Sequence, residues 1–314
     1  MNKRDTVLSI LDTDKIPETI PAAFFLHFDP AFHRGQAAVN KHLEYFRYTE
    51  MDFVKIQFEH TFPHLPQIQH PIDWVKMPFY ALDFYAEQLK VVQGLVKEAK
   101  KDALVILTLY SPFMCAVHST SEELLVRHIQ ENPDAVRQGM QVITDSLMAF
   151  VKECIRLGLD GFYTSSQGGE AGRLASPSLF HACVRPYDLQ LMEEIDRSCI
   201  FNILHVCDYR MPYQDLTPFV QYPGHVVNCS LELAGDKEIT PREVSTLFNR
   251  PFMGGLDRLG ILATGSTEEV RAAAISACSM LPDRAILGAD CTVPGGTSWD
   301  NLKTAIETAH TFRK

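Results

Sequence analysis

The stretch Val136–Thr164, VRQGMQVITDSLMAFVKECIRLGLDGFYT, contains the alternation that decides the fold. Its apolar side chains recur every three or four residues from Val136 to Cys154, which predicts an amphipathic helix. Gly158 stands where a helix commonly ends, and the run Gly161–Thr164 then predicts a short buried strand. A helix that leads directly into a buried strand indicates an α/β protein.

The same alternation extends along the whole chain. Helix-start signals separate the apolar runs, as in Thr240-Pro241 with Glu243 and in Ser266 with Glu269. The predicted strands are Ala22–Phe28, Phe53–Gln57, Leu104–Tyr110, Gly161–Thr164, Phe201–His205, Val226–Cys229, Pro251–Met253 and Ala285–Leu287. Strands that alternate with helices predict parallel pairing, and eight such units favour a closed (β/α)₈ TIM barrel.

An open dinucleotide-binding sheet is the competing α/β architecture. Neither Gly168-Gly169 nor Gly254-Gly255 has the third glycine and the spacing of G-x-G-x-x-G. We therefore expect a single barrel domain over residues 1–314 with a short N-terminal helical extension. Its active site is expected at the carboxyl ends of the strands, where TIM barrels carry their chemistry.

Composition and charge narrow the class of function. The 314 residues are 46% hydrophobic and have a formal net charge of −10, which argues against an extended nucleic-acid surface. No apolar run approaches the ~20 residues of a membrane span, and the N-terminus lacks a signal-peptide pattern. The eight cysteines lack the spacing of a disulfide framework, so we expect reduced thiols in a cytoplasmic protein.

The stretch Phe201–Asp208, FNILHVCD, ends a predicted strand with two potential metal ligands. In an extended strand, residues i and i+2 project from the same face, so His205 and Cys207 can converge on one point. Cys291 follows the last predicted strand, which opens onto the same mouth of a barrel. One imidazole and two thiolates suit Zn²⁺, with a fourth position left for water or substrate. In the structural alternative, Cys291 only packs against Pro294.

Other polar side chains follow the remaining strands at the same predicted end. Each could either act in the site or cap a loop. The candidates are His27, Glu59, His60, Ser111, Ser165, Ser166, Gln167, Glu170, Asn228, Glu232 and Asp257. We favour Glu59 and Glu170 among them.

Several segments together resemble the uroporphyrinogen decarboxylase superfamily, which also contains the zinc-dependent corrinoid methyltransferases of the methylcobalamin:coenzyme M type. The resemblance covers nearly the whole chain. It rests on His42-Leu43-Glu44 leading to Asp52–Lys55, and on Thr108–Phe113, Gly158–Tyr163, Arg185–Asp188, His205–Cys207, Gly254–Asp257, Asp290-Cys291 and Asn301-Leu302. The family fold is a (β/α)₈ barrel, in agreement with the strand count.

The decarboxylase branch is characterised by an N-terminal Arg-Gln-Ala-Gly-Arg loop that neutralises the carboxylates of a porphyrinogen. The corresponding region here, Phe24–Pro30, contains no arginine, and Arg34 is the only one nearby. The catalytic aspartate of that branch corresponds to Glu59, a longer carboxylate. The resemblance therefore implies that this chain is poorly suited to bind a polyanionic tetrapyrrole.

The methyltransferase branch carries His-x-Cys and a distant single cysteine, which correspond to His205, Cys207 and Cys291. The resemblance implies a zinc site that holds a substrate thiol as thiolate, for attack on the methyl group of a methylcorrinoid. Glu170 or Glu59 would be a fourth ligand or an acid/base residue.

The sequence thus predicts a zinc-dependent methyltransferase acting between a corrinoid (methylcobalamin, or a corrinoid on a partner protein) and a small thiol-type acceptor. The residues predicted to bind the corrinoid are Ser111, Gly254, Gly255 and Asp257. A metal-free decarboxylase, with Glu59 and Tyr163 as its catalytic residues, is the first alternative. A non-catalytic corrinoid or tetrapyrrole binder is the second. A homodimer is compatible with each, and neither nucleic acid nor a membrane is an expected partner.

Overall fold

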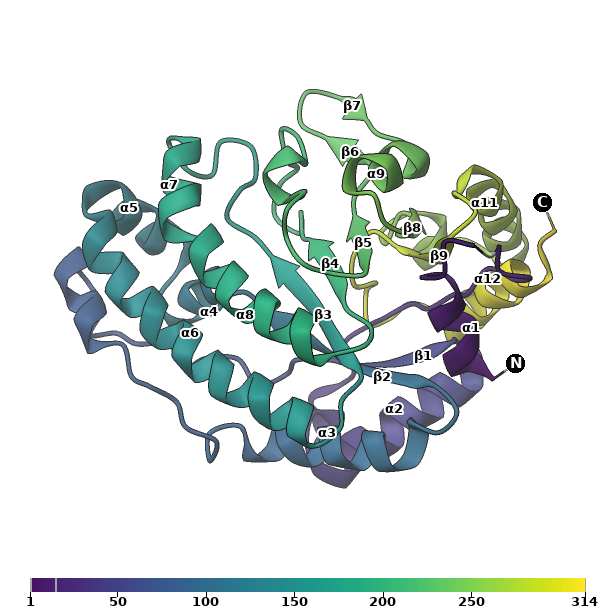
Figure 1. Cartoon of the computed structure of the whole chain (residues 1–314), viewed down its shortest axis with the longest axis horizontal. Coiled ribbons are helices and arrows are strands. Elements are labelled where there is room, and N and C mark those ends of the chain that lie inside the picture. The colour runs from purple at the N-terminus through teal and green to yellow at the C-terminus, as the bar shows by residue number, and fades with distance from the viewer. Residues whose placement is uncertain (1, 15, 314) are drawn as a thin grey trace.

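The computed structural model describes residues 2–14 and 16–313 and confirms the α/β organisation. Its centre is a curled sheet of seven parallel strands in the order β1-β2-β3-β4-β5-β8-β9 (Figure 1). These strands are β1 (Phe53–Ile56), β2 (Leu104–Tyr110), β3 (Gly161–Ser166), β4 (Ile203–Val206), β5 (Val226–Cys229), β8 (Phe252–Leu256) and β9 (Ala285–Ala289). A small antiparallel hairpin, β6 (Glu232–Leu233) with β7 (Lys237–Glu238), follows β5.

The predicted strand Ala22–Phe28 is the main departure from the expected barrel. It makes two isolated parallel bridges, Ala22 with Leu287 and Leu26 with Val293. On its other side, the amide of Asp52, just before β1, donates to the carbonyl of Ala22 at 3.0 Å. The amide of Ala22 donates to the carboxylate of Asp52 at 2.7 Å. A side chain therefore takes the place of the backbone carbonyl that a neighbouring strand would supply. The segment therefore lies between the two edge strands without forming a regular strand.

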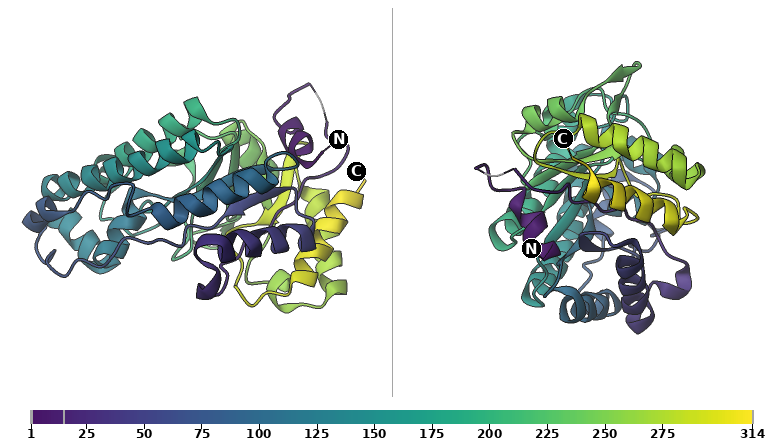
Figure 2. Two further views of the ribbon diagram at one scale, coloured as in Figure 1. Left: turned by 90° about the horizontal axis from the view of Figure 1, so that it is seen from below. Right: turned by 90° about the vertical axis from the view of Figure 1, so that its right-hand side faces the viewer.

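Helices follow most strands and cover the outer face of the sheet. They are α2 (Gly35–Thr49), α3 (Ala86–Ala99), α4 (Pro112–Ser119), α5 (Glu122–Glu131), α6 (Pro133–Arg156), α7 (Pro177–Cys183), α8 (Arg185–Ser198), α9 (Pro241–Phe248), α10 (Ile261–Thr264), α11 (Thr267–Met280) and α12 (Trp299–Thr311), with 3₁₀ helices at Pro30–Phe32, Pro71–Lys76 and Thr217–Phe219. Helix α8 packs on β3 and on α6, whereas α2 and α3 pack on β1 and β2 (Figures 1 and 2). Between β4 and β5 the chain forms only the 3₁₀ helix Thr217–Phe219, so the alternation of strands and α-helices is interrupted there.

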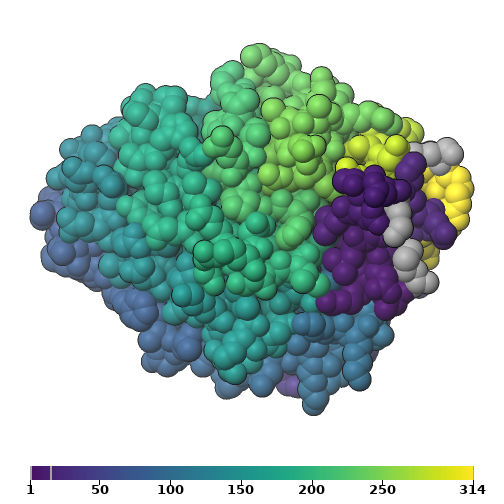
Figure 3. Space-filling view, in the orientation of Figure 1, coloured from purple at the N-terminus to yellow at the C-terminus, as the bar shows by residue number. Residues whose placement is uncertain are grey.

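Helix α1 (Lys3–Ser9) confirms the predicted N-terminal extension. The guanidinium of Arg4 donates to both carboxylate oxygens of Asp160, at 2.8 and 2.9 Å. Asp160 directly precedes β3, so α1 is held at the amino ends of the strands, opposite the predicted site. Figure 3 shows this N-terminal segment, in purple, next to the C-terminal residues in yellow.

The interior is mostly apolar, but several buried polar side chains lie on the strands toward their carboxyl ends. Thr108, Ser165, His205 and Asn228 are all at most 5% exposed. The eight cysteines are free thiols and all are buried. No helix within the described part of the chain is both long and apolar enough to cross a membrane.

Candidate metal centre

The three predicted metal ligands meet at the carboxyl end of the sheet. His205 lies in β4, Cys207 follows that strand by one residue, and Cys291 follows β9 by two. Their ligand atoms all lie within 4.8 Å of one another, and Cys291 Sγ is 3.4 Å from His205 Nε2. Strands β4 and β9 are separated in the sheet by β5 and β8, so the curl of the sheet brings these side chains together.

Hydrogen bonds fix the loop that carries Cys207. Its amide donates to the carbonyl of Ser166 at 3.0 Å. The hydroxyl of Tyr213 lies 3.1 Å from the carbonyl of Cys207 and donates to it. The side-chain amide of Gln167 donates to Cys207 Sγ at 3.3 Å. The position of this sulfur is therefore set by neighbours from β3 and from the following loop.

The environment of the three ligand side chains fits a zinc ion. They are 1%, 4% and 7% exposed, and His205 Nδ1 is a buried nitrogen without a hydrogen-bond partner among the described residues. A hydrogen bond from the Cys291 thiol, together with the nearby His205, holds the pKa of Cys207 well below its usual value. The same bond and burial raise the pKa of Cys291. One imidazole with two closely spaced thiols is a donor set that Zn²⁺ favours over harder cations, and it leaves a fourth position open.

Tyr163 supports the imidazole from the inner face of β3. The two rings lie 4.8 Å apart at 31°. The Tyr163 hydroxyl donates to Asn228 Oδ1, and Asn228 Nδ2 donates to the carbonyls of Met253 (2.9 Å) and Ala289 (3.0 Å). This predicted catalytic residue therefore lies beside the ligand set and connects it to β5, β8 and β9.

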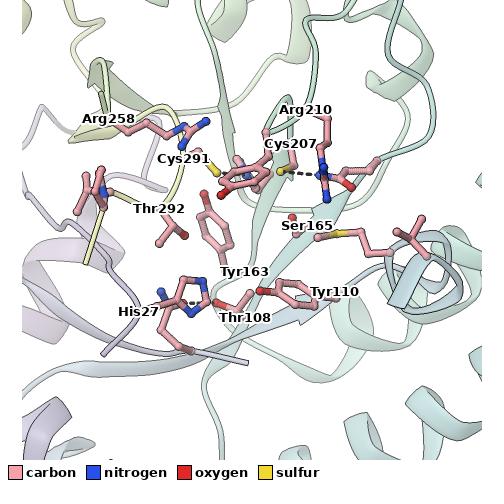
Figure 4. Close-up of a pocket in the computed structure, with 18 of the residues that line it drawn as sticks. His27, Thr108, Tyr110, Tyr163, Ser165, Cys207, Arg210, Arg258, Cys291 and Thr292 are labelled. Atoms are coloured by element: carbon pink, nitrogen blue, oxygen red, sulfur yellow. Dashed lines mark hydrogen bonds between the residues drawn. The ribbon is translucent and has the colours of Figure 1, made fainter. Parts of the chain in front are cut away.

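A cavity of about 470 Å³ opens over the ligand side chains (Figure 4). One part of its wall comes from β1 and β2 and the residues after them, including Gln57, Thr108 and Tyr110. Another part follows β8 and β9 and includes Arg258 and Thr292. A volume of this size is typical of a small-molecule site.

Glu59, a predicted acid/base residue, lies outside the group of ligand atoms. Its Oε1 is 2.9 Å from His27 Nδ1, and its Oε2 is 3.8 Å from His33 Nδ1. His27 lines the cavity, so Glu59 is linked to the cavity through this imidazole.

Glu170, the other predicted acid/base residue, is buried in the loop after β3. It accepts the amide of Gly168 at 2.7 Å and pairs with Arg173 at 2.6 Å. Burial raises the pKa of Glu170 to about 7, although Arg173 opposes this shift. Arg173 also pairs with Glu122 at 2.5 Å, and Glu122 lines the cavity. The described contacts of Glu170 therefore hold the loop after β3 in place.

The family model "Uroporphyrinogen decarboxylase (URO-D)" matches residues 54–312, a span that includes all three ligand side chains. The chain belongs to the URO-D family. No curated protein sequence matches it significantly.

Solved structures with the same fold include enzymes of methyl-group chemistry. A methyltransferase from Methanosarcina mazei superposes with a TM-score of 0.76, at 11% identity and 98% coverage of both chains. A B12-independent methionine synthase from Shewanella sp. W3-18-1 has a TM-score of 0.56, at 10% identity, over 93% of this chain and 94% of that one. A putative B12-independent methionine synthase from Listeria monocytogenes has a TM-score of 0.52, at 11% identity, over 86% and 84%. At these identities the likeness shows the fold alone.

The residues predicted to bind a corrinoid in this URO-D family member do not line the cavity over the ligands. Ser111 caps helix α4. Gly254 has a φ of +151°, and a Cβ there would lie 2.5 Å from the ring of Phe252, so the strand needs glycine at this position. Gly255 and Asp257 line a neighbouring cavity of about 400 Å³.

Among the other polar candidates, His27, Ser165 and Gln167 line the cavity over the ligands, whereas His60 and Glu232 do not. Lys55, Gln57 and Thr108 form a hydrogen-bonded group beside the cavity and were not among the predicted site residues. A lysine within the apolar run FVKI of β1 was the available signal, because a charge inside a buried strand needs a specific reason.

Proposed function

We propose that this chain is a zinc-dependent methyltransferase that moves a methyl group between a corrinoid and a small thiol. The observation that carries the proposal is the buried convergence of His205, Cys207 and Cys291 at one end of a cavity of about 470 Å³. These residues would hold Zn²⁺, whose charge would stabilise a substrate thiol as its thiolate near neutral pH.

The protein's own residues would bind and orient the acceptor. The contact of the tilted Tyr163 ring with His205 and the hydrogen bond from Gln167 to Cys207 Sγ would fix two of the ligand side chains. In the transfer, the acceptor thiolate, which would have lost its proton on binding, would form a bond to the methyl carbon while the cobalt–carbon bond broke. The electron pair of that bond would stay on the corrinoid. The main contribution of a protein to such a displacement is to hold the sulfur in line with the methyl carbon.

The donor would approach the mouth of the cavity instead of entering it. A corrinoid is much larger than a cavity of about 470 Å³, which suits only a small molecule. The rim offers apolar surface, because Tyr209 and Leu259 line the cavity and are each 56% exposed. The corrinoid would rest on this rim, either as free methylcobalamin or bound to a partner protein.

Metal-free decarboxylation of a porphyrinogen has less support in the site. A substrate with many carboxylates needs cations that are free to pair with it. Two arginines, Arg210 and Arg258, line the cavity. Each already pairs with a carboxylate of the protein: Arg210 with Glu122 at 3.8 Å, and Arg258 with Asp290 at 3.9 Å.

Metal analysis and a methyl-transfer assay test the proposal together. We expect about one zinc per chain, as in a mononuclear three-residue site. We also expect methylcobalamin to be demethylated in the presence of a small thiol. Cys207→Ser should abolish both properties, whereas Cys115→Ser, which changes a buried cysteine on α4, should retain them.

Three results would contradict the proposal. The first is less than about half an equivalent of zinc that is unchanged by Cys207→Ser. The second is zinc-independent formation of coproporphyrinogen from uroporphyrinogen, which would identify a decarboxylase. The third is corrinoid binding without turnover that survives His205→Ala, which would identify a binding protein.

A further inference from the structure

Lys55 places a positive charge in the interior beside the cavity. It lies in β1 and is 5% exposed, and no carboxylate of the described residues lies within ion-pair distance of its ammonium group. Its partners are neutral: Nζ donates to Gln57 Oε1 and to Thr108 Oγ1, each at 2.8 Å. The faces of Phe25 and Tyr163 lie 4.4 and 4.5 Å away. A buried ammonium held only by neutral groups is costly, so a nearby anion would stabilise it.

A nearby anion would change how far Lys55 is protonated. Burial lowers the pKa of Lys55 to about 7, and the surrounding Cys291, Glu59 and Cys207 act in the opposite direction. Glu59, the one carboxylate among them, is bound to His27. A further negative group beside Lys55 would therefore keep it protonated.

Lys55 also determines which way the side-chain amide of Gln57 points. An ammonium group can only donate, so the atom of Gln57 that faces it must be the oxygen. The same oxygen accepts the hydroxyl of Thr108 at 3.2 Å. Gln57 Nε2 must then point the other way, and it is buried without a hydrogen-bond partner among the described residues.

An unpartnered buried amide is costly, and a ligand acceptor would satisfy it. Gln57 is 3% exposed and lines the cavity, as does Thr108. In Figure 4, Thr108 and His27 lie below Tyr163, whereas Cys207 and Cys291 lie above it. A small molecule in this cavity can therefore have one end near the sulfur atoms and the other near Gln57.

We propose that Gln57 Nε2, with the ammonium of Lys55 behind it, forms a subsite for the carboxylate of a small substrate whose other end faces His205, Cys207 and Cys291. Gln57 donates to the carboxylate, and Lys55 is a positioning residue that orients the amide and supplies the charge. The subsite deepens the proposed function and rests on it for the thiol at the opposite end of the substrate. The acceptor of the methyl group would then be a short mercapto acid.

The test uses the full-length protein without added metal and two probes that lack a thiol. Propionate and propionamide have the same size and differ in charge. We expect calorimetry or ligand-observed NMR to show propionate binding at least about tenfold more tightly, because a hydrogen bond to a charged group exceeds one to a neutral group. Equal affinity for the two probes would overturn the proposal.

Variants at Gln57 separate a direct contact from a structural effect. Gln57→Leu should weaken propionate about tenfold or more. Gln57→Glu keeps the shape and the bond from Lys55, and it should reverse the preference in favour of propionamide. Gln138→Leu, a matched change at an exposed position of α6, should leave both affinities unchanged. Unchanged propionate affinity in a folded Gln57→Leu protein would contradict the assignment.

Lys55→Met tests the positioning role through selectivity. It should remove the preference for propionate over propionamide, whereas a merely structural lysine would change both affinities equally. Adding zinc and comparing 3-mercaptopropionate with propionate then separates the two proposals. If the thiol gains nothing from zinc while propionate is still preferred over propionamide, the zinc proposal fails and the subsite stands.

Discussion

Cys291 Sγ lies 3.4 Å from His205 Nε2, although 86 residues separate them along the chain. His205 lies in β4 and Cys291 follows β9 by two residues, and the intervening β5 and β8 hold these two strands in place. The three predicted ligands are thus already close together in the folded sheet, and we expect zinc binding to require little rearrangement. Binding to the folded chain alone should then stabilise it.

Zinc should raise the free energy of unfolding by an amount that grows with the logarithm of the ratio of the free zinc concentration to its Kd. At a free zinc concentration about 100 times its Kd, the stabilisation is about 2.7 kcal/mol. Thermal melts with and without zinc measure this gain, and a chelator should reverse it. Cys291→Ala should show no gain, whereas Cys115→Ala should show the full gain. An equal gain in both variants would place the zinc elsewhere.

Glu170→Gln should leave the zinc content unchanged. Glu170 is bonded to Gly168 and Arg173, and its carboxylate is not part of the group of ligand atoms. The variant should instead lower the free energy of unfolding by about 1–3 kcal/mol, because Arg173 loses a charged partner in the interior. Glu193→Gln, an exposed change on α8, should have little effect. Loss of zinc from a folded Glu170→Gln protein would identify Glu170 as a fourth ligand.

Tyr163→Phe should destabilise the fold by about 1–3 kcal/mol, because it leaves Asn228 Oδ1 buried without its donor. Urea unfolding measures this cost. Tyr48→Phe provides the matched control, since Tyr48 is 44% exposed and its hydroxyl bond to Asp300 lies at the surface. If Tyr163→Phe loses turnover while its stability is unchanged, the phenol would act directly on the reacting atoms.

The convergence of His205, Cys207 and Cys291 could be predicted from the sequence because it depends on regular geometry. The i, i+2 relation of His205 and Cys207 follows from an extended strand, and the position of Cys291 follows from the parallel sheet. Ala22–Phe28 has the composition of a strand, but the carboxylate of Asp52 takes the amide of Ala22. Such a local exchange of a side chain for a backbone partner has no periodic signal.

The surroundings of the glutamates and of the lysine could not be predicted in the same way. Glu59 and Glu170 follow strands as active-site carboxylates do, but their pairing depends on His27 and Arg173, which irregular loops bring close. The role of Lys55 depends on Thr108, which is 53 residues away on the neighbouring strand. Contacts of this kind are set by side-chain packing and not by the spacing of residue types.

Asp188 on α8 should make the stability of the protein depend on pH near neutrality. It is 1% exposed and accepts hydrogen bonds from the hydroxyls of Ser166 (2.5 Å) and Tyr222 (3.3 Å), while its Oδ1 has no partner among the described residues. Burial raises the pKa of Asp188 to about 7, and the two hydroxyl bonds only partly oppose this. In the unfolded chain the pKa of an aspartate is about 3.9.

Between these two pKa values the folded protein holds a proton on Asp188 that the unfolded chain has lost, so the free energy of unfolding falls as the pH rises through this window. From pH 6 to pH 8 the fall due to Asp188 is about 1 kcal/mol. Asp188→Asn should remove this part of the pH dependence, as measured by urea unfolding at pH 6, 7 and 8. Asp196→Asn, at an exposed position of the same helix, should keep the wild-type slope. If Asp188→Asn also keeps that slope, the carboxyl is already ionised at pH 6 and its burial has been offset by the two hydroxyl groups.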